Sequence, residues 1–102
     1  EEHIRLEVVA SVAYGTNLSQ AREVLLDLIR EDKLILTDPA PSVVVSNLGD
    51  NGVDITMWVW TTVDDYWTVW KRIRENVYNA LNEHNIEIPF PQVQVHGIND
   101  PQ

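Results

Sequence analysis

The sequence predicts a single α+β domain in which a four-stranded antiparallel sheet carries two helices on one face. Three observations predict it: apolar residues alternate in two stretches, they recur at helical spacing in two others, and short turn motifs separate these stretches. A chain of 102 residues can bury one core and is below the size at which chains divide. The predicted order is βαββαβ, the ferredoxin-like arrangement, in which both crossover helices cover the same face.

The first strand and the first helix have the clearest periodicity. Apolar residues occupy the even positions of 4–14, while charged and polar residues occur at odd positions, so this stretch predicts a half-buried strand that Gly15 ends. Asn17 offers a side-chain oxygen to the first free amides of a helix, with Gln20 in the capping-box position. The helix that follows is amphipathic, with apolar residues at Leu18, Ala21, Val24, Leu25, Leu28 and Ile29.

A β-hairpin is predicted in the middle of the chain. Residues 38–41, Asp-Pro-Ala-Pro, form a rigid connector that leads into a short strand over Val43–Val45. Leu48–Gly52 contains the glycines and the Asp and Asn residues typical of a hairpin turn. Residues 53–61 alternate again and predict the third strand.

The second helix is predicted to begin near Thr62 or Asp64, where Asp64 and Asp65 suit the positive end of the helix dipole. It ends over residues 82–85, and a last strand is predicted over Ile86–Ile88. Its apolar stripe comprises Tyr66, Trp70, Ile73, Val77, Ala80 and Leu81. The basic segment Lys71–Arg74 lies mostly off this stripe, so we interpret it as a solvated face or, less simply, as a contact for an acidic neighbour.

Trp58 and Trp60 are predicted to lie on the sheet face that the helices leave open. They alternate with Met57 and Val59, which suit the helix-covered face. A base-stacking platform is disfavoured by the acidic charge and by Asp54 nearby. The favoured hypothesis is the buried centre of a protein interface, which requires partial exposure in one monomer. The alternatives are that a loop or the tail covers both indoles, or that the strand phase is reversed.

The end of the chain changes direction at two prolines. Pro89 and Pro91, with Phe90 between them, lack amide donors and cannot continue a central strand. We therefore predict a domain over residues 1–91 and an extended tail over 92–102. Val93 and Val95 alternate with polar residues, so this tail predicts an interface strand that needs a partner from another chain.

Composition disfavours several classes of function. Lys plus Arg number 7 and Asp plus Glu 16, giving a net charge of −9 that repels nucleic acid and anionic lipid. The chain has no cysteine, and no apolar run approaches the roughly 20 residues that span a bilayer. His3, His84 and His96 are scattered, and helix N-terminal charge accounts for Asp64 and Asp65. We therefore predict no enzyme, no metal site and no cofactor.

Several segments, in order, resemble the C-terminal cytoplasmic domain of the small-conductance mechanosensitive channel family, MscS. Each is weak alone, but together they cover nearly the whole chain. They are Ala13-Tyr14 leading to Ala21-Arg22, Asp38-Pro39-Ala40-Pro41-Ser42-Val43, Leu48-Gly49-Asp50, Asp65-Tyr66-Trp67 and Ile86-Glu87-Ile88-Pro89-Phe90-Pro91-Gln92.

The resemblance implies a membrane channel that opens under bilayer tension and releases ions and small solutes on hypo-osmotic shock. It also implies a homo-oligomer, a heptamer in the intact channel, whose cytoplasmic domains form a hollow cage on the inner side of the cell membrane. Residues 93–96 would then be the strand that closes the cage as a parallel barrel. The expected piece is a soluble domain of a longer channel, consistent with a first residue other than Met, and it contacts the membrane only through transmembrane segments it lacks.

A different function also fits the predicted fold. Ferredoxin-like domains include regulatory modules that bind small molecules between paired domains. That interpretation expects a glycine-containing ligand loop after the first strand, and Gly15-Thr16-Asn17 is a weak candidate.

Overall fold

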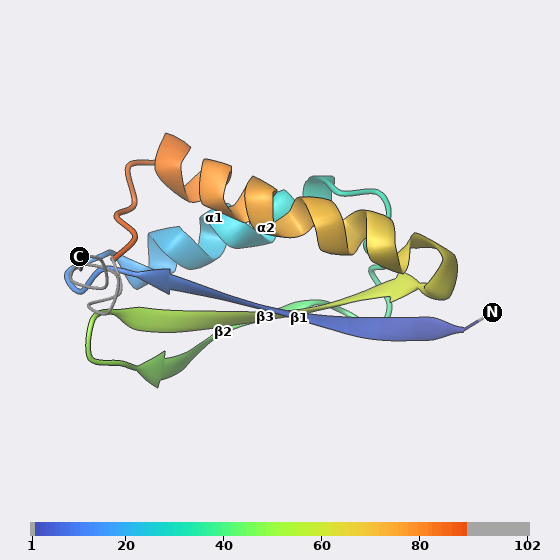
Figure 1. Ribbon diagram of the computed structural model, residues 1–102, viewed down its shortest axis with the longest axis horizontal. Coiled ribbons are helices and arrows are strands. Elements are labelled where there is room, and N and C mark those ends of the chain that lie inside the picture. The colour runs from blue at the N-terminus through green and yellow to red at the C-terminus, as the bar shows by residue number, and fades with distance from the viewer. Residues whose placement is uncertain (1, 90–102) are drawn as a thin grey trace, which may run out of the picture.

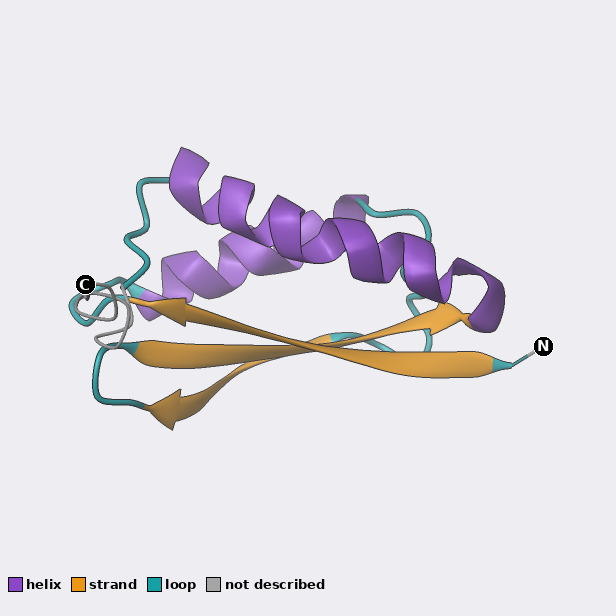
Figure 2. Ribbon diagram, in the orientation of Figure 1, coloured by secondary structure: helices purple, strands orange, loops and turns teal. Residues whose placement is uncertain are grey.

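A computed structural model describes residues 2–89, and it has two layers (Figures 1 and 2). One layer is an antiparallel sheet of three strands, and both helices lie on one of its faces. In chain order the elements are β1 (His3–Val12), α1 (Leu18–Glu31), β2 (Ser42–Leu48), β3 (Val53–Thr62), a 3-10 helix (Val63–Asp65) and α2 (Tyr66–Glu83).

The sheet has the order β1-β3-β2, so β3 is central and the other two strands are its edges. β1 pairs with β3 over its whole length, from His3 opposite Thr62 to Val12 opposite Val53. β2 pairs with the first half of β3, with a register shift between Val45 and Asn47 that indicates a β-bulge. The predicted hairpin is confirmed, since the amide of Gly49 donates to the carbonyl of Gly52 at 2.9 Å.

The hydrophobic core lies between the sheet and the helices. The alternation predicted for β3 is confirmed, because Ile55, Met57 and Val59 are fully buried while Trp58 and Trp60 are only partly covered. The cap predicted for α1 is also confirmed, with the amide of Gln20 donating to Asn17 Oδ1 at 3.1 Å. The buried face of α1 comprises Ala21, Val24, Leu25 and Ile29.

The fourth strand is not formed in the described residues. The amide of Ala13 donates to the carbonyl of Glu87 at 2.8 Å, which places residues 86–88 beside the end of β1. The ladder stops there for two reasons. The amide of Ile86 is bonded to the carbonyl of Leu81, and Pro89, next on the side that faces β1, has no amide to donate.

Three boundaries differ from the predictions. β1 ends at Val12. A turn begins at Ala13, whose carbonyl accepts a hydrogen bond from the amide of Thr16 at 3.2 Å. β2 covers Ser42–Leu48 and is longer than predicted. Its additional residues are exposed, which is possible because an edge strand need not bury them. α2 begins at Tyr66, after the 3-10 turn that contains Asp64 and Asp65.

The buried stripe of α2 also differs from the predicted one. It comprises Val69, Ile73, Val77 and Leu81. These residues follow one another at intervals of four, whereas Trp70 is rotated by about 100° from Val69. Trp70 therefore lies on the flank of the helix and is 38% exposed.

Candidate interaction surface

The open face of the sheet is apolar at one end. Trp58 and Trp60 are both half-buried there, between β1 and the start of β2. The guanidinium of Arg5 lies 5.8 Å from the centroid of the Trp58 ring, within the range of a cation–π contact. The indole nitrogen of Trp58 is buried and has no hydrogen-bond partner in the described part of the chain. The partial exposure that an interface requires is thus present.

The other end of the open face is polar and bonded internally. Ser11 Oγ donates to Asp54 Oδ1 at 2.6 Å, and Asn47 Nδ2 donates to Asp54 Oδ2 at 3.3 Å. Thr56 Oγ1 donates to Ser46 Oγ at 2.6 Å. Between this polar end and the tryptophans, Val9 and Val44 flank Thr56 and are exposed, so the apolar part of the face extends from the tryptophans to the middle of the sheet.

The segment that follows α2 and ends at Pro89 is packed against the turn of the β2–β3 hairpin. Pro89 lines a pocket of ≈ 250 Å³ together with Ser11, Asp54 and residues 49–52. A Cβ on Gly52 would lie 2.5 Å from the carbonyl oxygen of Val12 and 2.8 Å from Pro89 Cγ. Glycine is therefore required at this contact. The other predicted interface residues of this segment, Phe90, Pro91, Val93 and Val95, lie outside the described residues.

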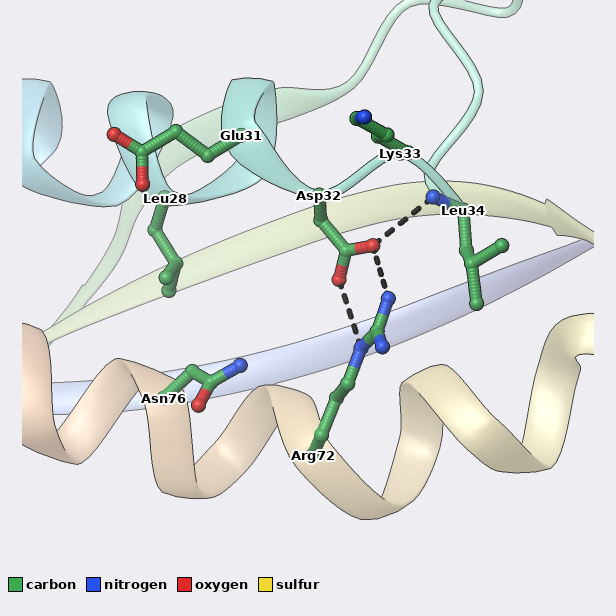
Figure 3. A pocket seen from close by; sticks show the side chains of 7 residues that line it. All are labelled: Leu28, Glu31, Asp32, Lys33, Leu34, Arg72 and Asn76. Carbon is green, nitrogen blue, oxygen red and sulfur yellow. Dashed lines mark hydrogen bonds and ion pairs between the residues drawn. The ribbon is translucent and has the colours of Figure 1, made fainter.

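A second pocket, of ≈ 580 Å³, lies between the end of α1 and the middle of α2 (Figure 3). Its centre is an ion pair between Arg72 and Asp32, whose carboxylate also accepts from the amide of Leu34 at 3.0 Å. Asp32 is the C-cap of α1 and its side chain is only 11% exposed. Arg72 belonged to the segment interpreted as a solvated face or a neighbour contact, and for this residue that interpretation is wrong. Arg72 connects α2 to the end of α1 through its ion pair with Asp32.

The ion pair gives the first testable prediction. Replacing Arg72 with Met keeps the aliphatic stem but leaves the Asp32 carboxylate without its cation. Because Arg72 is 41% exposed and its pairing is partly screened, we expect a loss of about 1–2 kcal/mol in the free energy of unfolding. Urea unfolding measures it. The matched control is Lys71→Met, which removes the same charge from an exposed neighbouring position, and an equal loss in both variants would contradict a specific role for the pair.

Within residues 2–89 the other polar candidates make local contacts. His84 is the C-cap of α2, as its position predicted, and its Nδ1 lies 2.9 Å from the carbonyl oxygen of Ala80. Thr62 Oγ1 donates to the Asp65 carboxylate at 3.1 Å. Within residues 2–89 no group of three or more His, Cys, Asp or Glu side chains could hold a metal ion. His96 lies outside that range. In the weak ligand-loop candidate, Gly15 adopts φ +92° and ends the turn that follows β1.

An aromatic cluster at the start of α2 was missed by the sequence reasoning. The Trp67 ring makes edge contacts with Tyr66 and Trp70, at centroid distances of 5.0 and 5.5 Å. The Arg74 guanidinium lies 4.7 Å from the centroid of Trp70. Trp67 is 60% exposed. The available signal was the spacing of Trp67, Trp70 and Arg74 by three and four residues, which places them on one flank of a helix.

The fold and the sequence segments together define a C-terminal domain of the MscS type. The family model for the C-terminal region of the mechanosensitive ion channel MscS matches residues 6–88. The chain belongs to the MscS family, which confirms the resemblance drawn from the sequence, and this family is one of channels, not of enzymes.

Similar proteins support this assignment. The chain is 32% identical over 92 residues to a small-conductance mechanosensitive channel of Edwardsiella ictaluri, covering 90% of this chain and 32% of the relative. It is 33% identical over 94 residues to an uncharacterized MscS family protein of Synechocystis, covering 92% and 32%. The crystal structure of Helicobacter pylori MscS in the closed state matches with a TM-score of 0.84 and 26% identity, covering 90% of this chain and 37% of that chain.

The chain thus spans about a third of the length of these three relatives. None of the helices between residues 2 and 89 combines the length and the hydropathy needed to cross a bilayer.

Proposed function

We propose that this chain acts as a C-terminal cytoplasmic domain of a channel that opens under bilayer tension and releases ions and small solutes on hypo-osmotic shock. The observation that carries the proposal is the family match over residues 6–88, together with the fold shared with a solved MscS channel. The domain itself has no pore and serves in assembly of the cytoplasmic cage on the inner side of the cell membrane. Its partners are further copies of itself, seven in the intact ring, and the other domains of the channel.

The proposed assembly role involves two parts of the chain, the tryptophans of β3 and the segment that begins at Pro89. Trp58 and Trp60 offer an apolar patch whose half-buried indoles suit the centre of an interface. Pro89, Phe90 and Pro91 form the hinge between the domain at 1–91 and the tail at 92–102. Val93 and Val95 contribute apolar positions to a barrel strand, and a closed barrel leaves no strand edge unpaired.

The proposed filtering role follows from charge. Each copy carries a net charge of −9, so a cage of many copies concentrates cations near its walls. This field acts within a Debye length of about 8 Å at physiological salt. It biases which ions reach the pore.

A chimeric channel tests the proposal. In a bacterial strain without mechanosensitive channels, residues 1–102 replace the corresponding domain of the Edwardsiella ictaluri relative. We expect the chimera to restore survival of hypo-osmotic shock, while a channel without any such domain does not. A second chimera ending at residue 91 is expected to assemble poorly, because it lacks the barrel strand.

Two results would contradict parts of the proposal. A chimera that reaches the membrane as a stable ring yet gives no tension-activated current in patches argues against the channel role. Unchanged ion selectivity after neutralisation of the exposed acidic residues argues against the filter.

A further inference from the structure

Within the described residues, β1 and β2 are the two edge strands of the sheet, on opposite sides of β3. The β1 side continues upward into the outer flank of α2. We call this surface the β1 flank, and it comprises Val63, Trp67, Trp70 and Tyr78. A second surface, the β2 flank, lies beyond the opposite edge.

The β1 flank is an aromatic ridge on α2 above the edge of β1, which pairs with no other strand than β3 within residues 2–89. A pocket of ≈ 210 Å³ is lined by residues 8–11 of β1 and by Arg74 and Tyr78 of α2, which shows that this side of the helix overhangs the edge. Trp67 and Trp70 stand further along the same side of the helix, with their rings in edge contact. Proteins rarely leave large aromatic side chains exposed in a cluster unless a partner covers them.

The β2 flank holds an apolar hollow instead. A pocket of ≈ 290 Å³ opens between the end of α1 and the connector to β2, lined by Leu26, Ile29, Ile35, Leu36 and Pro41, with Arg30 and Thr37 completing its wall. The amide of Leu36 donates to the carbonyl of Trp60 at 2.8 Å, so the connector takes the edge position beside β3 at this point. The β2 strand beyond it has exposed valines at 44 and 45.

The ridge and the hollow lie at the same end of the molecule. Trp60 and Thr62 mark the end of β3, where the connector binds and where the chain turns into α2 (Figure 1). β1 and β2 both run antiparallel to β3, so they are parallel to each other. A neighbouring copy in the same orientation would therefore bring its hollow beside the ridge and its β2 beside β1.

We propose that the β1 flank of one copy docks on the β2 flank of the next, with Trp67 and Trp70 entering the apolar hollow. This inference rests on the proposed homo-oligomeric assembly and names its contact. It is a head-to-tail contact, of the kind that generates rings when the rotation closes. The two edges lie next to each other, which removes two exposed edges at once.

The charges beside the two surfaces are complementary. Lys71 and Arg74 accompany the ridge on α2. On α1, Arg30 at the hollow lies 3.0 Å from the Asp27 carboxylate and 4.0 Å from Glu23, so this group carries a net negative charge. A second copy therefore matches the two surfaces in apolar character and in charge, whereas an edge-to-edge pairing of two β1 strands leaves the hollow unfilled.

Cysteine cross-linking tests the contact, because the chain has no cysteine of its own. Lys71→Cys lies one turn along α2 from Trp67, and Thr37→Cys lies at the hollow. With a short bismaleimide, we expect the two single variants to cross-link when mixed and not when separate. A chain with both substitutions is expected to form a ladder beyond the dimer. Glu83→Cys, on the opposite flank of α2, replaces Lys71→Cys as the matched control and gives no mixed product.

Substitution of a tryptophan in the ridge tests whether the cross-linked contact depends on these side chains. Because central Trp residues commonly contribute 2 kcal/mol or more to an interface, Trp67→Ser should weaken self-association about tenfold or more. Sedimentation equilibrium measures this, and circular dichroism confirms that the variant is folded.

Three outcomes would overturn the inference. A Lys71→Cys homodimer without a mixed product indicates a symmetric contact. Oligomers detected by light scattering without the mixed cross-link indicate another interface and leave the assembly proposal intact. A chain that stays monomeric and uncross-linked at millimolar concentration lacks this contact, and the survival assay of the chimera still judges the channel role separately.

Discussion

Replacing Gly52 with Ala is expected to destabilise the domain and to loosen its exit segment. The added Cβ would lie 2.5 Å from the backbone oxygen of Val12 and 2.8 Å from Pro89 Cγ, so a strand or the exit must shift. Overpacking of this kind costs about 1–3 kcal/mol. In a domain of this size, each 1 kcal/mol lowers the Tm by roughly 4–8 °C.

Two measurements separate this effect from a general loss of stability. Asn51→Ala, in the same turn and exposed, serves as the control and should leave the Tm nearly unchanged. Amide exchange at Ala13, which donates to Glu87, should accelerate in Gly52→Ala more than exchange in the centre of β3. If the two variants melt together, the close approach of Pro89 to the hairpin is wrong.

Replacing Met57 with Ala is expected to have the largest effect of any single truncation discussed here. Met57 has no exposed surface, and it lies on the central strand opposite Val8 of β1 and Val43 of β2. Losing its side chain removes buried apolar area and leaves a cavity, at a cost of about 2–5 kcal/mol. That is a large share of the 5–15 kcal/mol typical of a whole domain.

Denaturant unfolding with a matched valine tests this prediction. Val44 lies on the opposite face of the sheet, 38% exposed, and Val44→Ala should cost less than about 1 kcal/mol. A smaller loss in Met57→Ala than in Val44→Ala would show that the core does not lie on the predicted face of β3.

Elements whose apolar pattern is imposed by one buried face could be predicted from the sequence. β1, β3 and α1 each alternate or repeat with a single period, and Asn17 caps α1 as its side chain suggests. The phase of β3 follows too, because only one of its faces is uniformly apolar. This phase placed Trp58 and Trp60 on the open face.

The failures occur where several partners compete for the same group. Ile86–Ile88 has the composition of a strand, but the amide of Ile86 is bonded to Leu81 and Pro89 lacks one, so a ladder cannot extend. Trp70 is hydrophobic enough for the core. The buried stripe of α2, however, consists of residues spaced by four, and it includes Val69 instead of Trp70. The pairing of Arg72 with Asp32 joins residues 40 positions apart, which no local pattern reveals.

The candidate surface was predicted in part. The half-buried indoles of β3 were found. The ridge at Trp67 and the hollow beyond α1 were not, because the hollow arises only when the connector at Ile35 and Leu36 returns to the edge of β3. A pattern along the chain cannot show a concavity that α1 and the connector to β2 enclose together.

The contact of Pro89 with the hairpin has a mechanical consequence. A pull on the chain after Pro89 reaches Val12 and Gly52, at the end of the sheet where β1 ends and β3 begins. Paired strands loaded along their length share the force over many hydrogen bonds. The contact at Gly52 and the bond from Ala13 to Glu87 thus pass part of any load to the end of the sheet, while the bond from Ile86 to Leu81 passes another part to the end of α2.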